Sequence, residues 1–219
     1  MTVITPLSSA MRDGSRPEHE AAEQANFMAE LLDGGLSARA YADLLLRLRR
    51  VYAALEEVSR TMADDPIVAA VHDPALDRCA AIDADLAYWA PGEDPEAVVS
   101  PATDAYVERI HAAQRWGGLL LAHHYTRYLG DLSGGQVIAR MLERTYPGVG
   151  GDDRTGVSFY TFAAIPKTKP YKDRYRASLD AVALGGDEVE QVVDEVRVAF
   201  ELNRALFNEL GGRLDSYRR

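Results

Sequence analysis

Several features that define other protein classes are scarce in this 219-residue sequence. It has a single cysteine, Cys79, so it forms neither an internal disulfide nor a multi-cysteine metal site. No apolar run approaches the roughly 20 residues that a membrane span needs. The amino terminus lacks the charged and then apolar pattern of a signal peptide. These absences predict a cytoplasmic protein with no membrane anchor.

Positive charge is also in short supply. The chain has 24 basic and 34 acidic side chains, for a formal net charge of −10, and only three of the basic residues are lysines. Such a balance gains nothing from the phosphate electrostatics that drive nucleic-acid binding, so we exclude that class. Hydrophobic residues make up 47% of the chain, which is enough for a sizeable core.

What the sequence does contain is helical periodicity. The length and pattern predict a single domain over residues 1–219, with flexible ends at 1–14 and 212–219. No apolar stripe is left over for a dimer seam, so we expect a monomer. The fold class is all-α, with six to eight helices. Caps, prolines and glycines place them from Ser15 to Gly34, from Ser37 to Asp64, from Asp73 to about Trp89, from Asp104 to Arg144, after Pro170, and from Asp187 to Leu210.

The stretch at residues 124–136 is the most informative. Gly130, Gly134 and Gly135 interrupt a long helical pattern, although each glycine costs a helix about 1 kcal/mol relative to alanine. Glycines four residues apart share one face, where a missing side chain permits close approach to the backbone. Close helix packing or a simple kink would explain the glycines alone. Asp131 favours a ligand site, because it places a carboxylate beside that bare surface, with Arg127 one turn earlier.

A histidine near the start is a second candidate. His19 is a suitable axial ligand for haem iron, and Glu23 four residues later can bond the other ring nitrogen and fix its tautomer. Taken alone, a pair with this spacing is equally typical of an exposed helix surface.

Together these segments resemble the haem oxygenase family. The sequence HYTRYLGDLSGGQ at 124–136 is similar to the family signature nearly residue for residue. The resemblance continues through PEHEAAEQANFM, VYAALEE, DLAYW, FYTFAAI, YKDRYRASLD and AFELNRALFNEL, in that family's order. It implies an all-α fold in which haem lies between a proximal N-terminal helix and a kinked distal helix that contains glycines.

The resemblance also implies roles for individual residues. His19 corresponds to the proximal iron ligand, with Glu23 as its hydrogen-bonding partner. Gly130 and Gly134 correspond to distal-helix glycines that let haem and oxygen lie against the backbone. Asp131 corresponds to the aspartate whose water network delivers protons to bound oxygen.

Further residues fall at positions of the same site. The distal network would include Arg127, Tyr52 and Asn203. The haem propionates would contact Tyr125, Lys172, Arg176 and Arg12. Arg12 stands where many relatives have lysine, and His124 stands where they often have a small residue; we assign His124 no role.

The implied activity is cleavage of haem b by O2 and reducing equivalents to biliverdin, CO and ferrous iron. With basic residues at all the propionate positions, we expect the α isomer of biliverdin. The sequence has no flavin or nucleotide motif, so electrons would come from an external reductase or ferredoxin. Arg47, Arg49 and Arg50 form either a docking patch for that partner or a solvated helix face.

Two other functions remain open from the residues. A haem carrier or chaperone would need His19 and the basic groups but no proton-delivery network. A di-iron carboxylate oxidase would use Glu108 and His111 as one Glu-x-x-His pair, but such sites need two pairs and no second pair is found.

Overall fold

The computed structural model describes residues 5–219. Over this range the chain is helical, and its only extended pairings are two isolated bridges, one of which joins Leu36 to Arg218. The all-α prediction is confirmed. The α-helices of the described residues are α1 (Leu7–Gly14), α2 (Arg16–Glu23), α3 (Asn26–Asp33), α4 (Ala38–Thr61), α5 (Pro66–Ala69), α6 (Cys79–Trp89), α7 (Pro101–Ala112), α8 (Gly117–Asp131), α9 (Gly135–Thr145), α10 (Thr168–Asp180), α11 (Gly186–Gly211) and α12 (Leu214–Tyr217).

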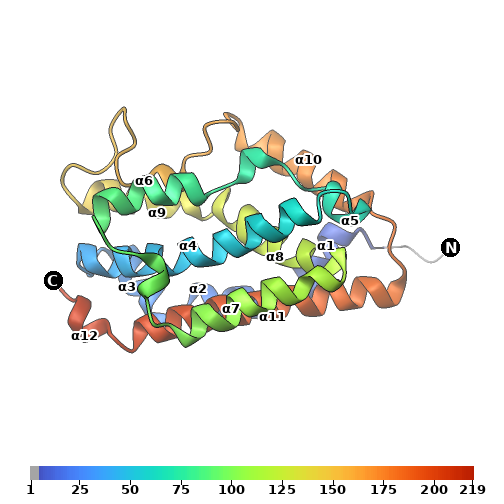
Figure 1. Ribbon diagram of the computed structural model, residues 1–219, viewed down its shortest axis with the longest axis horizontal. Helices are drawn as coiled ribbons and strands as arrows, with labels where there is room; N and C mark the ends of the chain where they lie inside the picture. Colours follow the sequence, from blue (N-terminus) through green and yellow to red (C-terminus); the bar gives the residue numbers. More distant parts are fainter. Residues whose placement is uncertain (1–4) are drawn as a thin grey trace.

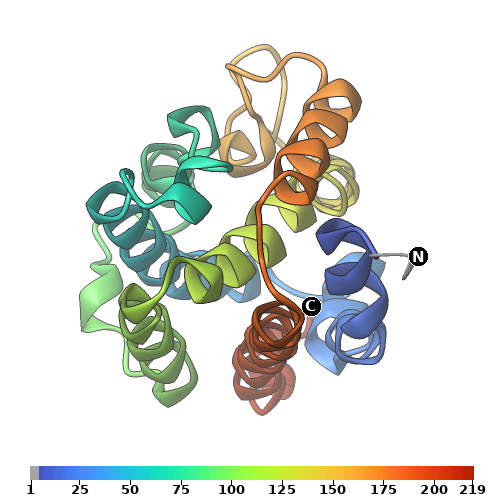
Figure 2. The same cartoon turned by 90° about the vertical axis from the view of Figure 1, so that its right-hand side faces the viewer.

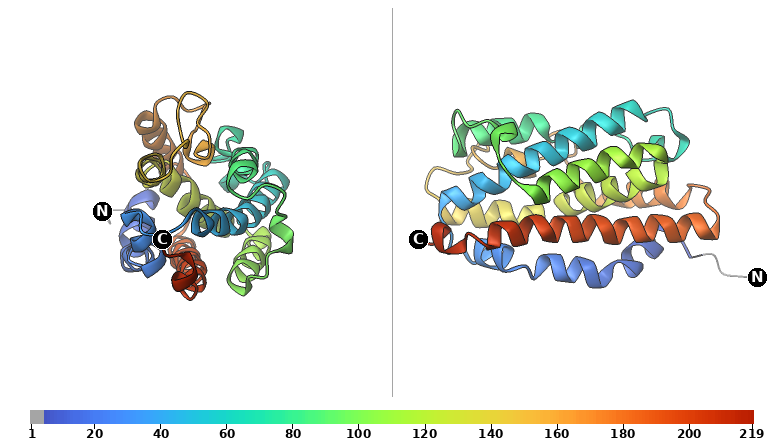
Figure 3. Two further views of the ribbon diagram at one scale, coloured as in Figure 1. Left: turned by 90° about the vertical axis from the view of Figure 1, so that its left-hand side faces the viewer. Right: turned by 60° about the horizontal axis from the view of Figure 1, so that its bottom comes forward.

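Two long helices organise the molecule. Helix α4 runs through the middle and packs against α6, α7 and α8, whereas α11 packs against α8, α7 and the three N-terminal helices (Figure 1). The right-hand view of Figure 3 shows α11 running along nearly the whole length, with the N-terminal helices beside it. Helix α10 lies at the outside, against α1 (Figure 2). Four short 3-10 helices complete the described part: η1 (Pro74–Leu76), η2 (Pro95–Ala97), η3 (Ala113–Arg115) and η4 (Ser158–Tyr160).

Helix boundaries follow the sequence signals where glycine or an acidic cap sets them. Gly34 ends α3 in the left-handed conformation, with φ of 80°, as a C-terminal glycine does. Asp65 and Asp73 accept hydrogen bonds from the first backbone amides of α5 and η1. The break predicted near Gly134 falls between the last residue of α8, Asp131, and the first of α9.

Other boundaries differ from the prediction. The helix expected from Ser15 to Gly34 is two helices, because the chain turns at Gln24 and Ala25. Ser15 precedes α2 but does not cap it through its side chain, because its hydroxyl donates to the carbonyl of Met11 at 2.7 Å, back into α1. The stretch from Asp104 to Arg144 has one more break, at η3 and Trp116.

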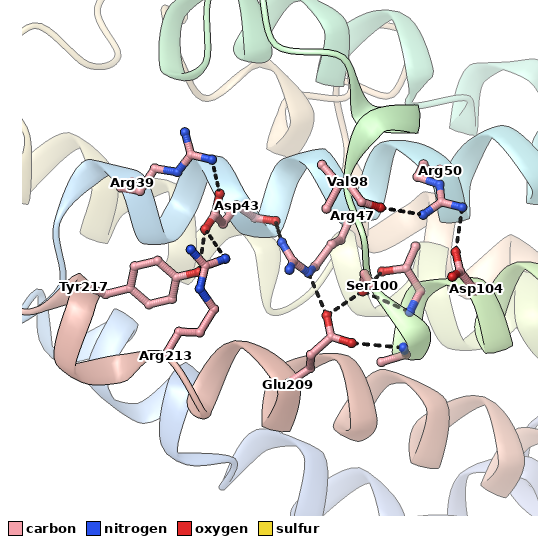
Figure 4. A network of polar contacts seen from close by, with 12 residues as sticks. Arg39, Asp43, Arg47, Arg50, Val98, Ser100, Asp104, Glu209, Arg213 and Tyr217 are labelled. Atoms are coloured by element: carbon pink, nitrogen blue, oxygen red, sulfur yellow. Dashed lines mark hydrogen bonds and ion pairs between the residues drawn. The ribbon is translucent and has the colours of Figure 1, made fainter.

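Both ends of the described chain contain short helices. Residues 7–14 form α1, which buries Leu7 and Met11, whereas residues 1–4 of the expected flexible end lie outside the described residues. At the other end, Tyr217 is buried and donates its hydroxyl to the carboxylate of Asp43 on α4 (Figure 4). Arg213 also pairs with Asp43, at 3.0 Å. Residues 7–14 and 214–217, within the ends that we expect to be flexible, thus lie in helices that bury side chains.

Three arginines of α4, at positions 47, 49 and 50, are paired with other helices. Arg47 is buried, and its Nε donates to Glu209 Oε1 at 3.1 Å, tying α4 to α11 (Figure 4). Arg49 and Arg50 form ion pairs with carboxylates of α6 and α7. Arg47 therefore cannot contribute to a docking patch, whereas Arg49 and Arg50 form surface ion pairs.

Candidate functional site

A cavity of about 390 Å³ opens where helices from distant parts of the sequence meet. Its walls come from α2, α3, α4, α8, α9 and α11, together with η4. This volume lies in the range of ligand and cofactor sites. The lining is mainly apolar, with Met28, Leu32, Leu44, Leu48, Val137, Ile138, Phe200 and Phe207.

His19 and Glu23 stand on one wall. They lie one turn apart on α2, and their facing atoms, Nε2 and Oε1, are 3.4 Å apart. The edge of the His19 ring meets Phe200 of α11, with centroids 5.1 Å apart. The His19 side chain keeps 48% of its surface exposed, so it is accessible from the cavity that it lines. One ring nitrogen thus faces a carboxylate, which leaves the other for a ligand bond.

Bare backbone forms the opposing wall. A Cβ built on Gly130 would meet nothing within 4 Å, and one on Gly134 would meet only the Gly130 carbonyl, at 3.6 Å. Both glycines line the cavity. Gly135 is different, because its Cβ would lie 2.6 Å from the ring of Tyr160. The first two glycines therefore leave space open at the cavity, and the third permits close packing against the aromatic wall.

A polar cluster lies beside Gly130 at the cavity. The hydroxyl of Tyr52, from α4, donates a short hydrogen bond to Asp131 Oδ2. Arg127 donates through Nε to the same hydroxyl at 3.1 Å and through Nη1 to Asn203 Oδ1 at 2.8 Å. Its Nη2 lies 3.7 Å from Asp131 Oδ1. Asp131, Arg127 and Asn203 also line the cavity, whereas Tyr52 supports them from behind.

Burial governs the ionisation of this cluster. It raises the pKa of the Asp131 carboxyl, although Arg127 and the Tyr52 hydroxyl act to lower it. Burial also raises the pKa of Tyr52 well above its usual value, so the hydroxyl keeps its proton. For Arg127, burial lowers the pKa, but Tyr52 and Asp131 raise it by more, so it remains a cation. The result is a carboxyl whose raised pKa suits it to exchanging a proton.

The basic residues expected at the site lie outside the cavity lining. Lys172 is nearest: its Nζ donates to Ser133 Oγ at 2.9 Å, in the turn between Gly130 and Gly134. Burial and the neighbouring Arg176 lower the pKa of Lys172. Arg12 forms an ion pair with Asp13 on α1.

Tyr125 links this group to the N-terminal helices. Burial raises its pKa, and Arg176 and Arg12 oppose that rise, so both cations lie within electrostatic reach of the phenol. Seven of the twelve predicted residues thus line the cavity, one lies directly behind it, and four cluster beside it: Arg12, Tyr125, Lys172 and Arg176.

An aromatic wall was missed by the sequence reasoning. Phe159 and Tyr160 of η4 line the cavity. Asp85 holds their backbone by accepting hydrogen bonds from the amides of Ser158 and Phe159, each at 2.8 Å. Gln136 donates to the carbonyl of Tyr160 at 2.7 Å. The sequence signal for this wall was the aromatic run FYTF at residues 159–162. Its pattern is that of a short extended segment, which gave no reason to place it at a site.

A buried arginine completes this support. Arg78 is 6% exposed and donates to the carbonyl of Thr161 at 3.0 Å, while its guanidinium lies 3.8 Å from the ring centre of Phe162. Its position before α6 gave no sequence signal, since a lone arginine is usually a surface residue.

The described residues contain no group of three or more histidine, cysteine, aspartate or glutamate side chains placed to hold a metal ion. In the same range, no helix is long and apolar enough to cross a membrane. His19 is the histidine that lines the cavity.

Comparison with known proteins agrees with this geometry. The family model described as "Heme oxygenase" matches residues 5–209. The "Heme oxygenase" of Pyropia yezoensis is 35% identical over 214 residues, covering 95% of this chain and 87% of that protein. "Heme oxygenase 1" of Synechocystis is 36% identical over 210 residues, covering 95% and 86%. The crystal structure of heme oxygenase-1 from the cyanobacterium Synechocystis in complex with heme has a TM-score of 0.89 and 34% identity, and covers 97% of this chain and 95% of that one.

Proposed function

Because the chain belongs to the haem oxygenase family, we propose that its cavity binds haem between His19 and the bare backbone at Gly130. The protein is a haem oxygenase, an enzyme that opens haem to biliverdin. Haem is thus the substrate, and the proposal concerns how the residues of this chain act on it.

The residues present fit such a ligand. The position of a Gly130 Cβ is open space, which allows a flat ring to approach the backbone. The lining is apolar, as a porphyrin face requires, and His19 faces the same cavity with one nitrogen free of Glu23. We infer that His19 is the iron ligand and that Glu23 fixes its tautomer.

The polar cluster would supply the protons. Bound haem provides iron, at which oxygen is activated against the ring itself. Asp131 holds a proton at its carboxyl or passes one through water, because burial raises its pKa toward the range of a general acid. Tyr52 fixes the carboxylate, and Arg127 fixes Tyr52 and Asn203. The buried hydrogen bonds among these groups carry the proposal, since a mere haem carrier has no use for them.

The basic group beside the cavity would orient the ring. Arg12, Lys172 and Arg176 are cations, and Tyr125 is a hydrogen-bond donor, so all four suit the propionates of haem. Because propionate pairing fixes the rotation of haem in its plane, it selects the carbon that is attacked. We propose that the product is the α isomer of biliverdin, formed with CO and ferrous iron.

Electrons and oxygen come from outside the chain in this proposal. A reductase or ferredoxin would supply the electrons. We further propose that the protein acts as a cytoplasmic monomer, in keeping with its lack of a membrane-spanning helix among the described residues.

Haemin spectra of a His19→Ala variant test the proposed ligand. We expect the wild-type Soret band of a histidine complex, its loss in His19→Ala, and its return when free imidazole is added. His111→Ala, on the exposed face of α7, is the matched control and should keep the wild-type spectrum. An unchanged spectrum in His19→Ala would show that another residue binds the iron.

A further inference from the structure

His124 is a fully enclosed polar side chain that the proposed chemistry does not use. It lies on α8 with 2% exposure, and its Nδ1 is 2.8 Å from the hydroxyl of Tyr175 on α10. The two rings are nearly parallel, with 9° between their planes, and the edge of Tyr128 packs against the imidazole at 4.5 Å. This hydrogen bond joins α8, which carries the glycines and Asp131, to the outer helix α10.

The imidazole of His124 keeps a single protonation state in the physiological pH range, so its hydrogen bond to Tyr175 does not change with pH there. Burial lowers the pKa of His124 to about 3; His72 adds to the effect and Asp73 opposes it. The ring is therefore neutral over the whole physiological range. A neutral imidazole and a phenol satisfy each other inside the protein, whereas leaving either group unpaired there is costly.

Contacts from three directions hold α10 in its rotation about its axis: α1 packs against it, with the Ser8 amide donating to Asp180 Oδ1 at 2.8 Å, and its inward face meets α8 and Asp73. Tyr171, Tyr175 and Leu179 recur every four residues and form its inward stripe, in which Tyr175 and Leu179 are buried. Tyr171 donates to Asp73 Oδ2 at 2.8 Å, and Tyr175 bonds His124. Two tyrosine hydroxyls thus contribute, with buried Leu179 and the bond from Ser8 to Asp180, to fixing which face of α10 points inward.

The same helix carries two of the proposed propionate ligands. Lys172 and Arg176 each follow a tyrosine of the inward stripe, so they lie about 100° further round the helix and one turn from each other. Lys172 reaches the turn at Ser133, beside the cavity glycines. Any roll or tilt of α10 therefore moves both cations relative to the cavity.

We propose that His124 is a positioning residue, which acts through Tyr175 to hold α10 in the rotation that presents Lys172 and Arg176 to the carboxylates of the porphyrin. This inference rests on the proposed binding of haem in the cavity. It assigns to His124 control of how tightly haem is held and of its rotation in the plane, and hence of which biliverdin isomer forms.

A mutant cycle on haemin affinity tests the inference. We expect His124→Ala and Tyr175→Phe each to weaken haemin binding about 3- to 10-fold, the effect of one lost hydrogen bond. In a Lys172→Ala/Arg176→Ala background, the same two changes should have little further effect, because the cations through which they act are gone. His124→Asn, whose amide lies near the position of Nδ1, should restore most of the affinity.

The distribution of biliverdin isomers is the second readout. His124→Ala and Tyr175→Phe should each yield a mixture where the wild type yields mainly one isomer. Tyr146→Phe is the matched control, since it removes a buried hydroxyl bond of 2.8 Å to the carbonyl of Leu36, away from α10. It should lower thermal stability while leaving affinity and isomers unchanged.

The possible outcomes distinguish a failure of the proposed function from a failure of the proposed role of His124. A wild-type protein that does not bind haemin would overturn the proposed function. A working wild type in which both variants keep the affinity and the isomer would overturn the role of His124. An equal loss of affinity with and without Lys172 and Arg176 would also overturn it, since the effect would not pass through those cations.

Discussion

Asp131 illustrates how a single residue acquires its chemistry from its surroundings. Its carboxyl is enclosed beside the open backbone of Gly130, and burial raises its pKa despite the neighbouring guanidinium of Arg127. A surface aspartate would remain ionised and keep no proton to give. In the proposed chemistry, the position of Asp131, more than its residue type, suits it to donate a proton.

Removing that carboxyl should separate binding from catalysis. We expect Asp131→Ala to bind haemin normally but to form biliverdin at least about 100-fold more slowly, which is the contribution of a general acid. Single-turnover absorption spectra measure both properties. Asp83→Ala, which removes an exposed carboxylate paired with Arg49, is the control. Biliverdin formation at the wild-type rate in Asp131→Ala would exclude this role.

Glu195 should make the fold sensitive to acid. Burial raises its pKa, but hydrogen bonds from His123 and Arg109 lower it by more, to about 2. Because the pKa of Glu195 is lower in the folded protein than its usual value of 4.5, the ionised carboxylate stabilises the fold at pH values above 4.5. This stabilisation is lost as the pH falls toward 2. We expect Glu195→Gln to reduce the free energy of unfolding by about 3 kcal/mol at pH 7.

The pH dependence of that difference is the critical observation. Urea unfolding of both proteins between pH 7 and pH 3 should show the gap shrinking below pH 4.5. A gap of constant size across this range would mean that the glutamate contributes through packing and not through its charge.

The sequence allowed the chemical groups to be predicted but not all of their supports. His19 and Glu23 are one helical turn apart, so their proximity follows from spacing alone. Arg78 and Asp85 could not be found in this way, because they act on residues 158–161, more than 70 positions away. Their role exists only once the chain has folded.

At the scale of helices, the glycines at the junction of α8 and α9 have two different structural roles. Gly130 and Gly134 leave room at the cavity, and Gly135 leaves room for the ring of Tyr160. In the sequence, all three glycines appeared as a single interruption of one helical pattern. Only the direction in which each missing Cβ would point separates the ligand surface from a packing contact.

Alanine substitutions should distinguish these two roles of the glycines. Gly130→Ala should raise the apoprotein's free energy of unfolding by up to about 1 kcal/mol, because alanine favours the helix and its methyl meets no atom. It should also weaken haemin binding, because the methyl enters the cavity. Gly135→Ala should instead destabilise the apoprotein by about 1–3 kcal/mol through its clash with Tyr160. Thermal unfolding and haemin titration measure the two effects, and equal behaviour of the variants would contradict the assignment.

Helix breaks were predictable where the local sequence sets them. Gly34 ends α3 as predicted, and α4 ends at Thr61, three residues before the predicted Asp64. The helix expected from Asp73 is only the 3-10 turn η1 at first, and α-helix begins at Cys79. The turn at Gln24 and the break before Trp116 have no such residue at the break itself. There the Trp116 ring lies over the first turn of α8, where a Cβ on Gly118 would be 2.4 Å from it. The adjacent Gly117 meets a distant residue, since a Cβ on it would lie 2.3 Å from Asp65 Oδ1, so tertiary packing also acts at this break.

At the scale of the molecule, the site exists because α2, α8 and α11 meet around one cavity. The periodicity of each helix showed an apolar face but not which partner it would cover. The resemblance to a known family supplied that arrangement, and the physical pattern alone did not.

That the chain is one domain stays a prediction, and calorimetry tests it. Because α11 contacts helices from both ends of the sequence, we expect the apoprotein to unfold in one transition whose calorimetric and van't Hoff enthalpies agree. Two separate transitions would show that the N-terminal helices or α10 unfold independently.

The central claim is that this cavity both binds haem and brings about the opening of its ring. The most direct measurement is a haemin titration followed by a reductant in air, with the absorption spectrum recorded throughout. The account predicts a Soret band that saturates at one haem per chain and then decays as biliverdin and free iron appear. A haem complex that persists unchanged under several reductants would contradict it and indicate a carrier.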